Sequence, residues 1–219
     1  MVNASNSILG CRVGWYSVRM LIPDPMTLIL QPKPFDDAEW IYEIKHDGFR
    51  ALAVIENGRC RFFSKNKHRL TGFRDLGEAL VKVLKVDNAI LDGELAATDG
   101  LGRTVFNALM RRSQKARYFA FDLLWLDGQD LRSVPLLARK QQLKRLLPAR
   151  SAHLLYVDHT KGAGTELYRL ACQLDLEGIV AKRAASQYDH NSDAKDWIKI
   201  KNPLYSQKEG RGDLFRRAG

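Results

Sequence analysis

The segment Glu43–Arg50, which contains one lysine, constrains this chain more than any other stretch of its sequence. Residues 40–44 and residues 51–55 have the composition of strands. The Asp47-Gly48 pair between them is a common turn signal. The sequence therefore places Lys45 at the edge of a sheet, where a lysine is either an ordinary surface residue or a reactive amine.

Strand and helix patterns alternate along the rest of the chain. Further strands are expected at residues 61–64, 89–96, 118–126, 178–182 and 197–201, and helices at residues 73–84, 105–110, 136–147 and 164–174. The helix at residues 136–147 has a basic face formed by Arg139, Lys140, Lys144 and Arg145. A face of this kind is usually solvated, and contact with phosphate is the alternative.

The composition carries an excess of positive charge and few cysteines. Lys and Arg number 35 against 25 Asp and Glu, for a net charge of +10. Such an excess attracts polyanions such as nucleic acid, although it also serves solubility alone. The cysteines, Cys11, Cys60 and Cys172, lie far apart, which favours a reducing compartment. Because no apolar run reaches transmembrane length, we expect a cytoplasmic protein with no membrane partner.

Six short segments follow one another in a fixed order. They are Glu43–Arg50, Ser64–Asn66, Leu91–Leu95, Phe121–Leu124, Glu177–Lys182 and Trp197–Lys201. Together they resemble the covalent nucleotidyltransferases, most closely the adenylation domain of ATP-dependent DNA ligases of the bacterial repair type. The resemblance implies an α+β (mixed α/β) fold, in which mainly antiparallel sheets with flanking helices surround a nucleotide cleft.

The resemblance implies that Lys45 attacks the α-phosphate of ATP and forms a lysyl-AMP phosphoramidate. An amine must lose its proton to attack, and an unperturbed lysine titrates near pH ~10.4. Cationic neighbours lower this pKa. Lys182, Lys199 and Lys201 match the family's α-phosphate contacts and supply such charges, and the last two share a strand face. An exposed strand edge guarded by lysines is the alternative.

The resemblance also implies a divalent metal, Mg2+ or Mn2+. Glu177 matches the metal ligand, and Glu94 serves the ribose or the metal. Magnesium takes one or two carboxylates together with substrate phosphates, which fits two acids distant in sequence. Either acid is alternatively an ordinary surface residue. Asp47 supports the lysine loop or the metal, and the sequence leaves both roles open.

Other matched residues are expected to bind the nucleotide itself. Phe121 resembles the aromatic residue that stacks on adenine, and a core phenylalanine is the alternative. Glu43 resembles the acid that accepts from the adenine amino group and so selects ATP over GTP. Ile44 adjoins the lysine in this cofactor-binding set, and Arg50 corresponds to a ribose and later nick-phosphate contact.

One motif departs from the family pattern. Many relatives have Ser-Arg-Asn-Gly where this chain has Ser64-Lys65-Asn66-Lys67. Lys65 keeps the positive charge but loses the two-pronged guanidinium. Recognition of the nick phosphate is therefore expected to be weaker or differently aimed.

The resemblance covers residues 31–203. Residues 1–30 are expected to form a poorly ordered N-terminal extension, and residues 204–219 a basic tail. Full ligases continue into an oligonucleotide-binding (OB) barrel, whose strands average ~5–6 residues each. Only 18 residues follow Lys201. We therefore expect a lone nucleotidyltransferase domain without an OB-fold, either naturally minimal or truncated.

These features predict an ATP- and magnesium-dependent DNA ligase-type adenylyltransferase of the bacterial cytoplasm or nucleoid. Lys45 takes AMP and passes it to the 5′-phosphate of a nick in double-stranded DNA, and the 3′-hydroxyl then seals the strand for repair. Complete ligation is expected to be weak without an OB-fold, unless an OB-fold or repair protein acts in trans. The alternatives are an RNA ligase or end-processing adenylyltransferase and a non-catalytic nucleic-acid-binding remnant.

Overall fold

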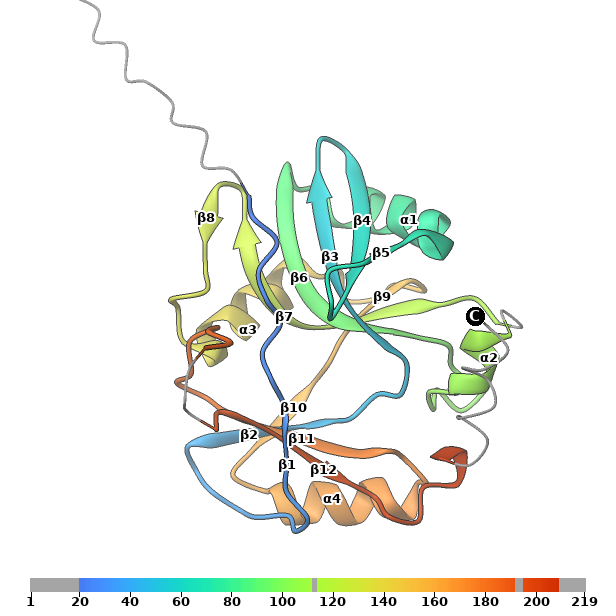
Figure 1. Cartoon of the computed structure of the whole chain (residues 1–219), viewed down its shortest axis with the longest axis vertical. Coiled ribbons are helices and arrows are strands. Elements are labelled where there is room, and N and C mark those ends of the chain that lie inside the picture. The colour runs from blue at the N-terminus through green and yellow to red at the C-terminus, as the bar shows by residue number, and fades with distance from the viewer. Residues whose placement is uncertain (1–19, 112–113, 192–194, 209–219) are drawn as a thin grey trace, which may run out of the picture.

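The computed structural model describes residues 20–111, 114–191 and 195–208, which form two β-sheets stacked one above the other (Figure 1). The smaller sheet has the order β1-β12-β11-β2-β10. Its strands are β1 (Ile29–Leu30), β2 (Trp40–Ile44), β10 (His159–Lys161), β11 (Gly178–Arg183) and β12 (Trp197–Lys201). All neighbours in it are antiparallel except β1 and β12, which are parallel.

The larger sheet has the order β5-β4-β3-β6-β7-β8, and β9 adds to β7 in parallel. Its strands are β3 (Phe49–Glu56), β4 (Arg59–Ser64), β5 (Arg69–Leu70), β6 (Asn88–Ala96), β7 (Arg117–Leu126), β8 (Gln129–Asp130) and β9 (Leu154–Tyr156). The predicted fold of mainly antiparallel sheets with flanking helices is confirmed. The short strands β1, β5, β8, β9 and β10 were not predicted, because two or three residues carry no readable periodicity.

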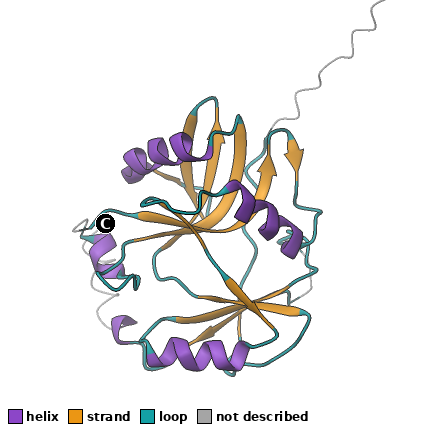
Figure 2. Cartoon of the chain, turned by 180° about the vertical axis from the view of Figure 1, so that it is seen from behind, coloured by secondary structure: helices purple, strands orange, loops and turns teal. Residues whose placement is uncertain are grey.

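The helices are α1 (Arg74–Leu84), α2 (Phe106–Met110), α3 (Leu136–Leu146) and α4 (Gly164–Gln173), with single 3-10 turns at Thr71–Phe73 and Ser206–Lys208. Three of the helices, α1, α3 and α4, pack on the sheets, and the short α2 lies at one side of the molecule (Figure 2). Leu80 of α1 and Leu143 of α3 enter one core with the larger sheet, whereas Ala171 of α4 packs against the smaller sheet. No helix within the described ranges is both long and apolar enough to cross a membrane.

A third apolar cluster joins the two sheets. It contains Ile41 and Trp197 of the smaller sheet together with Leu52 and Ile90 of the larger sheet. Met26 is buried in the same cluster. Residues 20–30, part of the predicted N-terminal extension, therefore run across both sheets (Figure 1), whereas residues 1–19 lie outside the described ranges.

The basic face predicted for α3 divides into a buried and an exposed half. Lys144 and Arg145 are exposed, as a solvated face requires. Arg139 and Lys140 are both 0% exposed, so the interpretation as a solvated face is wrong for these two residues. Arg139 donates from Nε and Nη2 to the two carboxylate oxygens of Asp122 on β7, each at 2.8 Å. The ion pair thus fastens α3 to the larger sheet.

Replacing Arg139 by methionine leaves the buried Asp122 carboxylate without its cation. We expect Arg139→Met to lower the free energy of unfolding by about 3 to 5 kcal/mol, as measured by chemical denaturation. Arg145→Met, on the exposed side of the same helix, is the matched control and is expected to change it by about 0.5 kcal/mol or less. Equal losses in the two variants would contradict the role of this buried pair.

Candidate active site

Most of the predicted site residues line one pocket between the two sheets. From the smaller sheet and the loop after it come Glu43, Ile44, Lys45, Val180, Lys182 and Trp197, and from the larger sheet Arg50, Glu94 and Phe121. Leu28, His46 and Val157 complete the lining. Its cavity volume is about 50 Å3. The pocket therefore draws on segments that are far apart in the sequence.

Strand pairing determines the surroundings of Lys45. This residue follows β2, which pairs antiparallel with β11 so that Ile44 lies opposite Ile179. The pairing brings Glu177, just before β11, next to the lysine, and Lys45 Nζ donates to Glu177 Oε2 at 2.6 Å. Lys201 Nζ lies 3.8 Å from the other carboxylate oxygen of Glu177. The amine is thus held by an opposite charge beside a second ammonium.

A cluster of lysines lies around the end of β12. Burial lowers the pKa of Lys199, and the positive charges of Lys201, Lys45 and Lys65 lower it further. The structure therefore brings together four of the predicted lysines, including Lys65 from the turn after β4. These ammonium groups repel one another, and a phosphate bound among them would relieve the repulsion. The cluster is therefore a favourable site for a phosphate.

Glu43 lies buried at the other end of the pocket between two lysines. Its Oε1 is 2.6 Å from Lys140 Nζ of α3, and its Oε2 is 2.6 Å from Lys182 Nζ of β11. Burial opposes the charged form of Glu43, but the two ammoniums outweigh burial and hold its pKa below the ordinary value. Glu43 is therefore a buried carboxylate that stays ionised.

Lys182 lies beside Glu43, two residues along the sheet from Lys199. Its ammonium is 4.0 Å from the ring centroids of both Phe121 and Trp197. Burial lowers the pKa of Lys182 to about 8. The structure thus separates Lys182 from the lysine cluster and places it among the aromatic rings.

Arg50 is fixed by a network at the rim of the pocket. Its Nε and Nη2 donate to Asp92 at 3.2 and 2.7 Å, and its Nη1 donates to the carbonyl oxygen of Met26 at 2.6 Å. Tyr188 Oη also donates to Asp92, at 2.7 Å. The guanidinium lies within 6 Å of both pocket rings, at 5.7 Å from Phe121. Arg50 therefore faces the pocket from a rigid position.

Three carboxylates from different parts of the fold, those of Glu94, Glu177 and Asp47, lie in one corner of the site with Lys45. Burial raises the pKa of Glu94 to about 8, Lys45 and Arg50 oppose the rise, and Glu177 and Asp47 add to it. Asp47 is buried and accepts a hydrogen bond from Tyr205 Oη at 2.9 Å. This contact favours a role for Asp47 in supporting the lysine loop. Within the described residues, no three His, Cys, Asp or Glu side chains form a metal-binding group.

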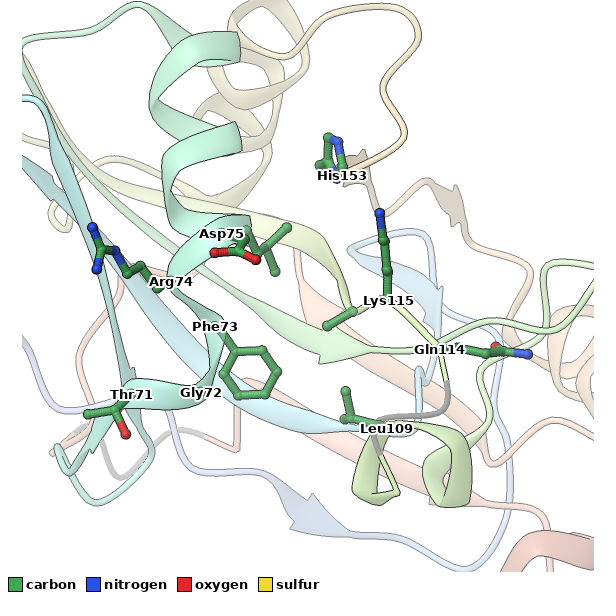
Figure 3. A pocket seen from close by; sticks show the side chains of 11 residues that line it. Thr71, Gly72, Phe73, Arg74, Asp75, Leu109, Gln114, Lys115 and His153 are labelled. Carbon is green, nitrogen blue, oxygen red and sulfur yellow. The ribbon is translucent and has the colours of Figure 1, made fainter.

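A roomier hollow lies away from this pocket (Figure 3). It measures about 510 Å3 and lies between the start of α1 and the segment before β7, with Phe73, Asp75, Lys115 and His153 on its walls. None of the predicted site residues lines it. The convergence of buried charges, and not the size of a cavity, therefore identifies the candidate site.

The sequence did not single out several residues that complete the site. Asp92 and Trp197 lie inside segments already recognised, but neither was assigned a role. Lys140 was hidden in the basic face of α3. Tyr188 lies in an irregular stretch between β11 and β12 with no local pattern. The packing of the layers places Trp197 in the pocket lining, Lys140 against Glu43, and Asp92 and Tyr188 in the network around Arg50.

Comparison with known proteins decides the family. The sequence pattern of the family described as "ATP dependent DNA ligase domain" matches residues 29–201. This chain belongs to the ATP-dependent DNA ligase family. The family membership predicted from the six segments is thereby confirmed, with the nucleotidyltransferase fold that it implies.

Two curated relatives show how this ligase-family chain compares with longer proteins. It is 35% identical over 190 residues to the multifunctional non-homologous end joining protein LigD of Pseudomonas aeruginosa, covering 84% of this chain and 22% of LigD. It is 30% identical over 190 residues to the SPbeta prophage-derived DNA ligase-like protein LigB of Bacillus subtilis, covering 84% of this chain and 68% of LigB. The chain thus spans about a fifth of the length of the first relative.

Solved structures agree with this family membership. The structure described as mycobacterial DNA ligase D complexed with ATP and MES superposes with a TM-score of 0.67 at 26% identity, over 81% of this chain and 60% of that one. The ATP-dependent DNA ligase from bacteriophage T7 in complex with ATP has a TM-score of 0.57 at 17% identity, over 81% of this chain and 68% of that one. The T7 likeness concerns the fold alone.

The raised pKa of Glu94 predicts a pH dependence of stability. Between its ordinary pKa of 4.5 and its folded pKa of about 8, the folded state binds a proton that the unfolded state releases. Stability must therefore fall as pH rises through this window. Glutamine cannot ionise, so the free energy of unfolding of Glu94→Gln should rise relative to that of wild type as the pH increases. Because Glu94 is only half-buried, we expect this relative increase to be about 1 to 3 kcal/mol between about pH 5 and about pH 8.

Chemical denaturation at a series of pH values measures this gain. Glu78→Gln, which removes an exposed carboxylate of α1, is the matched control and should follow the wild-type curve. If the free energies of unfolding of wild type and Glu94→Gln change in parallel with pH, the pKa of Glu94 is not raised in the folded state and the prediction is wrong.

Proposed function

We propose that this chain is an ATP-dependent DNA ligase-type adenylyltransferase. Lys45 accepts AMP from ATP and passes it to the 5′-phosphate of a nick in double-stranded DNA. Attack by the 3′-hydroxyl then seals the strand and releases AMP. One observation carries the proposal: Lys45 lies between an aromatic pocket with a buried carboxylate and a cluster of lysines, at 2.6 Å from Glu177. The two ends suit the base and the phosphates of one nucleotide.

The pocket suits an adenine base. The rings of Phe121 and Trp197 supply flat apolar faces, and base stacking on such rings is favourable. Glu43 is an ionised acceptor for the 6-amino group of adenine, whereas the 6-oxo group of guanine would repel it. Ile44 lines the base end, and Arg50 faces the expected place of the ribose. The mycobacterial relative solved with ATP supports the choice of nucleotide.

The lysines at the other end suit phosphate chemistry. Lys45 Nζ attacks the α-phosphorus, a phosphorus–nitrogen bond forms, and pyrophosphate leaves. Glu177 Oε2, within hydrogen-bonding reach of Nζ, is placed to take the proton that the amine loses. Lys199 and Lys201 neutralise the charge that develops on the phosphoryl oxygens. Electrostatic stabilisation at phosphorus is therefore the main contribution of the chain.

The acids near Lys45 suit a magnesium or manganese ion. Glu94 and Glu177 offer hard oxygen ligands, and two carboxylates with substrate phosphates match the preference of Mg2+. Burial raises the pKa of Glu94, and the charges of Glu177 and Asp47 raise it further, so a cation bound there would favour its ionised form. These two residues are the ones that would hold the ion. When bound, the ion supplies charge neutralisation for the phosphates.

The nucleic-acid substrate is proposed from charge and from the relatives. The net charge of +10 favours a polyanionic partner. Lys65 lies exposed after β4 and is electrostatically coupled to Lys199, so it can meet the nick phosphate. The relative with 35% identity is described as an end-joining protein, which fits repair of DNA in a bacterial cytoplasm or nucleoid.

Intact-mass spectrometry after incubation with ATP and magnesium tests the covalent step. We expect wild type to gain the mass of one AMP and Lys45→Ala to gain none, because Lys45 is the proposed nucleophile and the other lysines only neutralise charge on the phosphate. Lys33→Ala, which removes an exposed lysine outside the pocket, should charge like wild type. Chelation of the metal should abolish the gain. AMP on Lys45→Ala would refute the assignment of the nucleophile.

Matched nicked duplexes test the acceptor. We expect faster sealing of a DNA nick than of an RNA nick, with transfer of AMP to the 5′-phosphate visible on a gel. Lys45→Ala should still seal a nick that already carries 5′-AMP, because the lysine acts only before that stage. Preference for the RNA nick would support the RNA ligase alternative. Binding of both duplexes by wild type without any AMP transfer would support a non-catalytic binding module.

A further inference from the structure

The nucleotide pocket is too small for a nucleotide as it stands. Its volume is about 50 Å3, whereas sites for ligands of this size usually measure about 300 to 1,000 Å3. The ammonium of Lys182 fills the space beside the rings, at 4.0 Å from the centroids of both Phe121 and Trp197. If the proposed function holds, a purine that stacks there must displace this ammonium.

The two lysines on Glu43 are held very differently. Lys140 Nζ donates to the carbonyl oxygens of Val157 at 3.0 Å and of Phe121 at 3.3 Å. These contacts leave one ammonium proton for Glu43. Lys182 Nζ has its ion pair with Glu43, but within the described part of the chain no backbone carbonyl group accepts a hydrogen bond from it. Lys140 is therefore the fixed partner of Glu43, and Lys182 the exchangeable one.

We propose that Lys140 is a specificity-determining positioning residue, which keeps Glu43 charged and aimed at the nucleobase when the purine amino group takes the place of Lys182. The inference rests on the proposed adenylation function and names a residue outside the six recognised segments. Lys140 acts through Glu43 and through the carbonyl group of Phe121, so it supports both the acceptor and the stacking surface.

Within the described residues, the neighbouring histidine and tyrosine side chains supply no positive charge near pH 7 that could replace Lys140 beside Glu43. His46 follows β2, and burial lowers its pKa to about 4, so it is neutral near pH 7. His159 of β10 also has a pKa lowered by burial, and Tyr156 of β9 has a raised pKa and is neutral. Once Lys182 has moved aside, the ammonium of Lys140 is the cation that remains beside the carboxylate.

Removal of Lys140 should therefore raise the pKa of Glu43. Recognition of the amino group needs the ionised carboxylate, which is lost as pH falls through that pKa. The wild type, in which the pKa lies below its ordinary value, should keep its selectivity to lower pH than a variant without the lysine. The pH at which the preference for the amino-bearing purine disappears on acidification therefore reports on Lys140.

Three variants on one helix provide the test. Lys140→Met removes the charge and keeps the side-chain length, and Lys140→Arg keeps the charge. Lys144→Met removes an exposed lysine that pairs with Asp158 at 3.2 Å, and is the matched control. The rate constant of nucleotidyl-adduct formation is measured across the pH range for ATP, which transfers AMP, and for the analogue in which hydrogen replaces the 6-amino group, which transfers its own nucleoside monophosphate.

A hydrogen bond to a charged group changes affinity by about 10- to 150-fold, so wild type and Lys144→Met should prefer ATP by a factor in that range. Lys140→Met should prefer ATP over the analogue by only about threefold or less. As the pH falls, this variant should lose its preference for ATP at a higher pH than wild type does. Lys140→Arg should recover most of the preference. If Lys140→Met slows both nucleotides equally and leaves their ratio and its pH profile unchanged, Lys140 is merely structural and the inference is wrong.

Equilibrium binding separates this inference from the proposed function. Trp197 lines the pocket, so quenching of tryptophan fluorescence reports nucleotide binding without any charging. In a Lys45→Ala background, the same ratio of ATP to analogue should appear and should again depend on Lys140. Selective binding without AMP transfer in wild type would refute adenylation but uphold the role of Lys140. Absence of binding of either nucleotide would overturn both.

Discussion

The antiparallel pairing of β2, β11 and β12 is the constraint on which the site depends. It sets Lys45 opposite the start of β11, so that Glu177 meets the amine, and it sets Lys199 and Lys201 beside them. A slip of one residue would turn every side chain of β11 to the other face of the sheet. The apolar residues that face α4, among them Ile179 and Ile200, therefore fix the register of the reactive groups.

Buried ion pairs form around this register, both between layers and within one sheet. Lys140 of α3 meets Glu43 of the smaller sheet, while Arg50 meets Asp92 within the larger sheet. Buried pairs add little net stability because desolvation offsets their attraction, but each one strongly disfavours arrangements that leave a charge alone. Their main effect here is to specify one relative placement of the strands and helices that line the pocket.

The sequence predicts the parts of this site that carry a local pattern. Lys45 lies in a turn between two strand-like runs, and Lys199 and Lys201 alternate on one strand. Lys140 could not be found in this way, because its spacing on an amphipathic helix matches a solvated face. Its burial follows from the packing of α3 on β7, which no local pattern reveals. The short strands escape prediction for a similar reason, since their partners and not their composition define them.

The two ends of the pocket differ in exposure, and the difference follows the chemistry. Glu43 and Lys182 are buried at the base end, where low effective polarity strengthens each charge. Lys65 and Lys201 are exposed at the phosphate end, where bulk water weakens a single contact but a second phosphate can enter. An adenylyl group held on Lys45 would have its base enclosed and its phosphorus open to the solvent side. On the proposed function, nucleotide selection and transfer to a polyanion would therefore use one pocket without competing for the same charges.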